Sequence, residues 1–225
     1  MSDSAVTEET LTKEAIIAQQ MLEEKEADGK LRSYRGPVEQ IITVLFLIWS
    51  VYQIWANTIG VVDAMAMRTW HLLFLLVFTF LLFPAYKSER RIRTIPPVFD
   101  IVLLALTAVA FFYLLTNYVS VAKRGGYLNK ADLWIAGITM LLVFEAARRA
   151  CRSLAILGLI FLLYNFLGQF IPGTLGHVGF SLKRVLTIMI WGSQGIFGVG
   201  IGVSATYIFL FVLFGAYLKY SGFSQ

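Results

Sequence analysis

Residues 98–121 read VFDIVLLALTAVAFFYLLTNYVSV, and this stretch decides the fold class. Its only charged side chain is Asp100, close to its start. A helix crosses roughly 30 Å of hydrocarbon with about 20 apolar residues at about 1.5 Å each. Pro96 and Pro97 precede the stretch, where proline is compatible with the first turn of a helix. The stretch therefore predicts a helix that spans a membrane.

Comparable apolar blocks lie on both sides of this stretch. They occupy residues 38–62, 69–86, 131–147, 153–171 and 185–218. Apolar residues make up 58% of the 225 residues and charged residues only 15%. A soluble domain is far less apolar than this. We therefore expect an all-α, polytopic membrane bundle of five to six transmembrane helices.

The last block is too long for one straight span, because residues 185–218 would measure roughly 50 Å as a helix. Its middle contains Gly192, Gly195, Gly198, Gly200 and Gly202. We predict a short helix to about Ser193, a glycine-rich turn, and a spanning helix from about Val203. The turn is either a loop at the membrane surface or a break that lines a cavity, since irregular backbone at membrane depth needs protein or water around it.

Basic residues gather in two of the expected loops. The topology-setting residues are Arg90, Arg91 and Arg93 in one loop and Arg148, Arg149 and Arg152 in the other. Because short cytoplasmic loops are enriched in lysine and arginine, we expect both loops and the amino terminus in the cytoplasm. Basic residues at 123, 124 and 130, after the third block, weaken the contrast. The net charge of +5 is explained by these loops, so we expect no nucleic-acid partner.

The leader, residues 1–37, is polar and lacks the apolar core of a signal peptide. Thr7 is a candidate cap, and Leu11, Ala15, Ala18 and Leu22 recur at helical spacing. We predict an amphipathic cytoplasmic helix, either solvated or docked on another surface.

Residues with catalytic chemistry are sparse. The single cysteine, Cys151, excludes an intrachain disulfide and a cysteine cluster for a metal. His71 is expected at the membrane interface rather than as a ligand, and His177 is expected to form a loop hydrogen bond. We therefore expect neither an enzyme nor a metal or cofactor site.

The polar residues of the blocks are expected to serve structure. Glu39, Asp100, Asp132 and Glu145 lie near block ends, where they can reach water or pair locally. Gln53 and Asn57 are one helical turn apart inside the first span, so they should present their amides to a neighbouring helix.

A resemblance to a known family lies in the second half of the chain. It rests on Arg148-Arg149-Ala150-Cys151, Tyr164, Gly168, Pro172-Gly173, Gly176-His177, Gly195-Ile196-Phe197-Gly198 and the run from Gly202 to Leu218. This pattern resembles the fused permease of TRAP transporters of the TAXI subclass. It is strongest over residues 145–222, and the layout of residues 38–147 is similar to the small four-helix subunit fused ahead of the large one. The division expected is thus a leader at 1–37, a small-subunit-like domain at 38–147 and the start of the large subunit at 148–225.

The resemblance implies a secondary transporter of the bacterial inner membrane that takes up organic acids or related solutes. Such a permease uses an ion gradient, usually sodium, and receives its solute from a periplasmic binding protein. Family members continue for several hundred residues beyond the region matched here, and their ion and solute loops lie in that continuation. We therefore expect the solute and ion sites downstream of Gln225 and carry over no binding residue. This chain is expected to be the scaffold part that joins the remainder of the large subunit, and alone it should not transport.

Several residues are candidates for the helix break or for subunit packing. They are Pro172, Gly173, His177, Gly195, Gly198, Gly202, Ser204 and Thr206. Two other classes remain open: a membrane scaffold or assembly protein without transport activity, and, less well supported, an intramembrane enzyme acting on lipid.

Overall fold

The computed structural model describes residues 31–86, 92–93 and 95–222. The leader helix expected within residues 1–30 lies outside this part of the chain, as do Arg90 and Arg91. Of Arg93 only the backbone is described. Gln225 also lies outside the described residues, so the solute and ion sites expected downstream of Gln225 stay a prediction.

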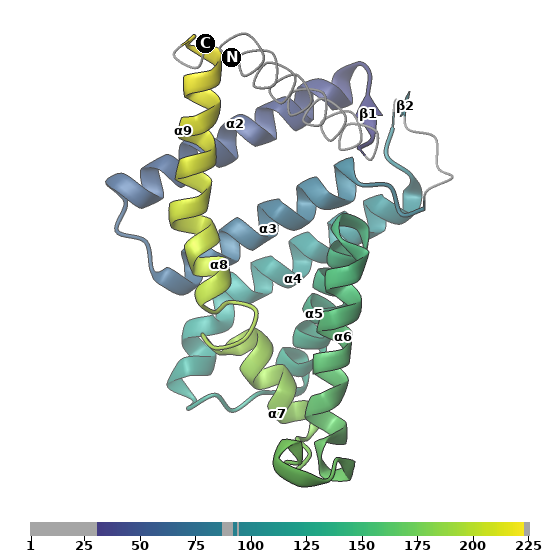
Figure 1. Ribbon diagram of the computed structural model, residues 1–225. Helices are drawn as coiled ribbons and strands as arrows, with labels where there is room; N and C mark the ends of the chain where they lie inside the picture. The colour runs from purple at the N-terminus through teal and green to yellow at the C-terminus, as the bar shows by residue number, and fades with distance from the viewer. Residues whose placement is uncertain (1–30, 87–91, 94, 223–225) are drawn as a thin grey trace, which may run out of the picture.

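The first half of the described chain is a series of long helices (Figure 1). They are α2 (Pro37–Thr58), α3 (Ala64–Leu82), α4 (Val98–Lys123) and α5 (Lys130–Ala150), followed by α6 (Arg152–Leu167). Local sequence explains where they begin. Pro37 is the first residue of α2, the Asp63 carboxylate accepts hydrogen bonds from the first amides of α3, and Pro97 precedes α4. The predicted blocks are therefore helices, and the all-α class is confirmed.

Short elements connect these helices. The two-residue strands β1 (Ser33–Tyr34) and β2 (Ile92–Arg93) pair in parallel. After α6 come two short 3₁₀ turns, η1 (Gly168–Phe170) and η2 (Gly173–Leu175).

The last segment is broken, as the glycines predict. It starts as α7 (Leu182–Leu186) and the π-helical η3 (Thr187–Trp191), and it resumes as α8 (Val199–Val203), the π-helical η4 (Ser204–Ile208) and α9 (Phe209–Tyr220). Residues 192–198 between the two arms form an irregular turn, which we call the break. The second arm begins at Val199, earlier than the expected Val203, because Gly200 and Gly202 are accommodated within helix.

Five helices in the described chain are long and apolar enough to cross a membrane. They are Pro37–Thr58, Ala64–Leu82, Val98–Lys123, Arg152–Phe170 and Val199–Tyr220. Helix α5 is long enough, but Lys130, Asp132, Glu145, Arg148 and Arg149 near its ends make it more polar. The chain is a multi-pass membrane protein whose apolar outer faces contact lipid.

The core lies between α3, α4, α5 and the first arm of the broken segment. Its fully buried members include Phe80, Phe111, Ala136, Ile190 and Phe197. This one core therefore draws side chains from both sides of the domain boundary expected at residues 147/148. By contrast, few residues of α6 and of the second arm are buried. The buried share is 11% in the most apolar stretch of Arg152–Phe170 and 6% in that of Val199–Tyr220. Helix α9 has no buried residue, and most of its large apolar side chains are exposed.

Candidate functional site: the polar anchor of the broken helix

A π turn in the second arm of the broken segment releases one backbone carbonyl. The Phe209 amide hydrogen-bonds the carbonyl of Ser204, five residues earlier, so the Ala205 carbonyl loses the partner that a regular α-helix would give it. Two side-chain amides of α2 donate hydrogen bonds to this carbonyl. Gln53 Nε2 lies 2.5 Å from the Ala205 oxygen and Asn57 Nδ2 lies 3.1 Å from it. The expectation that Gln53 and Asn57 face a neighbouring helix is thus confirmed.

A histidine from α3 completes this contact. His71 Nδ1 is 3.0 Å from Gln53 Nε2, and His71 Nε2 is 3.0 Å from Ser204 Oγ. Since the Gln53 amide nitrogen is a donor, Nδ1 must accept, which assigns the proton to Nε2 and makes Ser204 its acceptor. His71 is only 2% exposed, so the interfacial position expected for it is wrong. Its side chain instead joins α2, α3 and the π turn.

An arginine on the same face of α3 holds the break itself. Arg68 Nη1 donates a hydrogen bond of 2.9 Å to the carbonyl of Phe197. The Phe197 side chain is fully buried in the core and meets Phe111 edge to face. The backbone of the break is therefore hydrogen-bonded to α3, and the Phe197 side chain packs against α4. We call Gln53, Asn57, Arg68 and His71, with their partners in the broken segment, the polar anchor.

Two glycines permit this close packing. A Cβ at Gly195 would lie 2.6 Å from the carbonyl oxygen of Ile188 in the first arm. A Cβ at Gly202 would lie 2.9 Å from Arg68 Nε. Glycine is thus required at 195 by the backbone of the first arm, whereas a methyl group at 202 would displace the flexible Arg68 side chain.

In the break, Phe197 and Gly198 are buried whereas Ser193 and Gln194 are exposed. Both interpretations of the turn, a surface loop and a break that lines a cavity, therefore stay predictions.

The remaining candidate residues lie elsewhere. Thr206 bonds to the Gly202 carbonyl of its own helix, and Gly198 lies at the start of the second arm. Pro172, Gly173 and His177 belong to the loop after α6, at the opposite end of the broken segment from α9 in Figure 1. There the His177 ring stacks on Phe180 and its Nδ1 lies 2.8 Å from the Val178 carbonyl, as expected of a loop histidine.

A second polar group, the arginine–carboxylate network, joins the two basic loops. Asp100 Oδ2 lies 2.7 Å from Arg32 Nη1, and Asp100 Oδ1 lies 2.8 Å from Arg149 Nη2. The second contact is an ion pair by distance whose angles fall outside hydrogen-bond geometry. All three side chains are fully buried.

The network continues to the surface through Glu145. This carboxylate pairs with Arg149 Nε at 2.8 Å and with Arg148 Nη2 at 2.7 Å. Arg148 and Arg149 also approach the carbonyls of Ala85 and Phe83 after α3. The described residues directly after α3 therefore meet the basic end of α5 at one end of the bundle, as a shared side of the membrane for the two basic loops requires.

Sequence reasoning missed the partners that act across the fold. Arg68 was not among the candidate residues, although its spacing of three residues from His71 places both on one face of α3. Arg32 was placed in the leader, yet it is 2% exposed, so the end of the leader is docked. Asp100 was expected to reach water or to pair locally, and it instead pairs in the buried interior with Arg32 and Arg149, which are far away in the sequence.

Comparison with protein-family models, curated proteins and solved structures found no match for this chain. The chemistry of the site must therefore be inferred from its own residues. Within the described residues, no three His, Cys, Asp or Glu side chains are grouped as metal ligands. In the polar anchor the amide nitrogens of Gln53 and Asn57, the His71 ring and the Arg68 guanidinium bond to one another or to the broken segment. The Gln53 amide oxygen is buried without a hydrogen-bond partner in the part of the chain that the structure describes. This arrangement holds an interrupted helix in place.

Proposed function

We propose that this chain is the scaffold part of a membrane permease of the TRAP type. The observation that carries the proposal is the discontinuous last helix, whose break is held by Arg68 of α3 and whose second arm is held by Gln53 of α2 and His71 of α3. Discontinuous helices at membrane depth are characteristic of secondary transporters, where they line the path of the solute. The family resemblance of residues 145–222 supports the same class.

In this proposal the anchor makes the broken helix a static element. A transporter needs a fixed frame against which a mobile part moves its solute. Breaking the contacts at Ala205 and Phe197 would leave buried polar groups without partners, which costs about 1–3 kcal/mol each. The described part of the chain therefore suits a frame better than a moving element.

The exposed helices α6 and α9 provide surfaces for further parts of such a permease. Both are apolar and largely uncovered, so either lipid or other transmembrane helices can cover them. We propose that the remainder of a large permease subunit, downstream of Gln225, packs there and carries the solute and coupling-ion sites. A periplasmic binding protein would deliver an organic acid or related solute, and a sodium gradient in the bacterial inner membrane would drive uptake.

Uptake measurements in the native host test this proposal. Cells lacking the chain are compared with cells in which it is restored, using labelled dicarboxylates, keto acids and amino acids. We expect at least one organic acid to lose sodium-dependent uptake in the deletion strain and to regain it on complementation. A strain lacking the proposed periplasmic binding protein should show the same defect. Uptake of every tested solute at wild-type rates would instead favour the alternative, a membrane scaffold without transport activity.

A further inference from the structure

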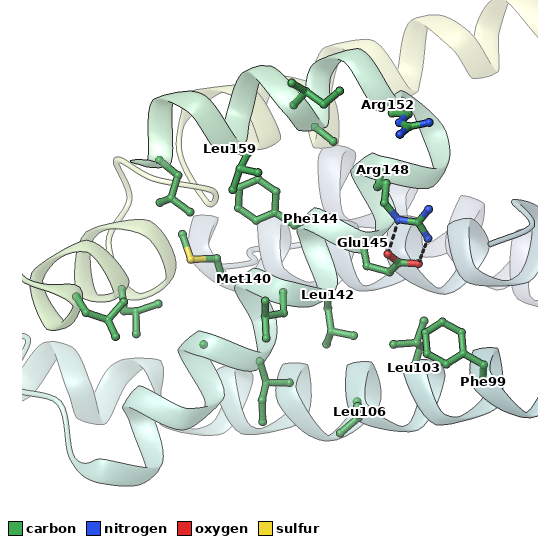
Figure 2. A pocket seen from close by; sticks show the side chains of 18 residues that line it. Phe99, Leu103, Leu106, Met140, Leu142, Phe144, Glu145, Arg148, Arg152 and Leu159 are labelled. Carbon is green, nitrogen blue, oxygen red and sulfur yellow. Dashed lines mark hydrogen bonds and ion pairs between the residues drawn. The ribbon is translucent and has the colours of Figure 1, made fainter. Parts of the chain in front are cut away.

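A deep groove opens between α4, α5, α6 and α7, away from the polar anchor (Figure 2). Its volume is about 940 Å³, at the upper end of the range of roughly 300–1,000 Å³ typical of ligand pockets. Apolar side chains line nearly all of it, among them Leu103, Met140, Phe144, Leu159 and Leu162. A polar solute would find almost no hydrogen-bonding partners along these walls.

Charged residues are confined to one side of the groove. Figure 2 shows Glu145, Arg148 and Arg152 gathered there, near the corner between α5 and α6. Glu145 is held by Arg148 on one side and Arg149 on the other. Arg152 is exposed and has no ion-pair or hydrogen-bond partner among the described residues. The groove lining thus contains two arginines and one carboxylate. Of the two arginines, Arg148 pairs with Glu145, and Arg152 has no partner in the described part of the chain.

The length of the groove matches one leaflet of a bilayer. On α6 its lining runs from Arg152 to Leu162, which corresponds to about 15 Å along the helix axis. Half of a hydrocarbon core of roughly 30 Å is about 15 Å. A chain lying in the groove from the bilayer midplane would bring its polar end to Arg152.

From this match of shape and charge we propose that the groove binds one anionic phospholipid. One of its acyl chains lies along the apolar walls formed by α4, α5 and α6, and its phosphate lies beside Arg152, with Arg148 nearby. Basic residues at the membrane end of an apolar crevice between helices suit such headgroups. The proposal concerns a lipid site and does not depend on the transport function proposed above.

Two variants separate the charged and apolar halves of the site. Arg152→Gln removes the guanidinium that has no partner in the described part of the chain. Because a cation at the first residue of a helix opposes the helix dipole, this change should not weaken the fold. Gly137→Leu fills the groove, since a Cβ at Gly137 meets no atom within 4 Å. Arg35→Gln is the matched charge control, because Arg35 is exposed and lies outside the groove lining. Gly215→Leu on α9, where a Cβ is equally unobstructed, is the matched size control.

Native mass spectrometry of the full chain in detergent measures the binding of added phosphatidylglycerol and of phosphatidylcholine. We expect the wild-type chain, Arg35→Gln and Gly215→Leu to retain one phosphatidylglycerol in preference to phosphatidylcholine. Arg152→Gln should lower this preference by about fivefold, as expected for one arginine near a lipid phosphate. Gly137→Leu should lose the bound lipid of either kind.

Three results would overturn the proposal. The first is an unchanged lipid preference in Arg152→Gln, and the second is lipid retention by Gly137→Leu equal to that of Gly215→Leu. The third concerns the source of the anion: if inorganic phosphate alone displaces phosphatidylglycerol at equal concentration, the arginine is a site for a free anion.

Discussion

The Arg68 guanidinium lies 2.9 Å from the main-chain oxygen of Phe197, so a side chain of α3 holds the backbone of the break 129 positions further along the chain. This donor is charged and half-buried, and hydrogen bonds of this kind contribute about 1.5–3 kcal/mol. Because Phe197 is also buried in the core, the contact couples the conformation of the break to the packing of α3 against α4.

Replacing Arg68 should loosen the break without unfolding the bundle. We expect Arg68→Ala to accelerate amide hydrogen exchange at residues 195–198 by about tenfold or more, as follows from the loss of about 1.5 kcal/mol or more. Exchange in the middle of α4 should stay unchanged. The control is Arg35→Ala, which removes an exposed arginine that makes no contact with the break. Equal protection of residues 195–198 in both variants would contradict the assigned role.

Alanine substitutions of three glycines should rank by what their new methyl groups meet. Gly195→Ala places a methyl against the backbone of Ile188 and Met189, which cannot yield, and should cost about 1–3 kcal/mol or more. Gly202→Ala displaces the Arg68 side chain, and this loss is partly offset by the better helix propensity of alanine.

Gly200→Ala provides the internal control for this series. Its Cβ would meet no atom within 4 Å, so only the helix propensity changes, by up to about 1 kcal/mol in favour of folding. Thermal unfolding of the three variants in one detergent should therefore give the order Gly200→Ala, Gly202→Ala, Gly195→Ala from most to least stable. An unfolding temperature of Gly195→Ala at or above that of the wild-type chain would show that the close approach at Gly195 is not real.

Local sequence was sufficient to predict the break but not its geometry. Glycines weaken a helix wherever they cluster, so a stretch too long for one span could be divided on composition alone. The π turn shifts the register of the second arm by one residue and thereby frees the Ala205 carbonyl for Gln53. No residue preference marks that shift. For this reason the amides of α2 were assigned to a neighbouring helix, whereas their acceptor and the role of His71 were not foreseen.

The arginine–carboxylate network was missed for a different reason. Each of its charges stands near the end of an apolar block, where water at the membrane surface is the simplest partner. Burial of Asp100 between Arg32 and Arg149 depends on how α4, α5 and the end of the leader pack, and spacing along one helix carries no information on that packing. The pairing of Glu145 with Arg148 and Arg149 follows helical spacing, and it agrees with local pairing, one of the two expectations for Glu145.

Removing the shared carboxylate of this network should be severely destabilising. Asp100→Asn leaves Arg32 and Arg149 buried without the negative charge that both face, and breaking a buried pair in this way costs about 3–5 kcal/mol. We expect a large loss of folded protein, measured as the monodisperse fraction after extraction in mild detergent. Glu39→Gln, which neutralises an exposed acid in the first turn of α2, should behave as the wild-type chain. Equal yields of the two variants would refute the structural importance of the network.

The meeting of the two basic loops makes the orientation in the membrane testable at two points. Cys151 is exposed at the corner between α5 and α6, close to the loops expected in the cytoplasm, and it is the only cysteine of the chain. Lys123 is exposed at the far end of α4. The 26 residues of this helix measure about 39 Å, which exceeds the hydrocarbon core of roughly 30 Å. The two positions should therefore face opposite sides.

Labelling with a membrane-impermeant maleimide distinguishes these sides. In intact spheroplasts we expect a Lys123→Cys variant in a Cys151→Ser background to react, whereas Cys151 of the wild-type chain should react only after lysis. The Cys151→Ser variant alone should not react in either preparation. Lysine and arginine in short loops favour the cytoplasmic side. Cys151 lies beside Arg148 and Arg152, so the positive-inside rule assigns it to the cytoplasm. Reaction of Cys151 in intact spheroplasts would reverse the assigned orientation, and it would place the charged side of the lipid groove in the outer leaflet.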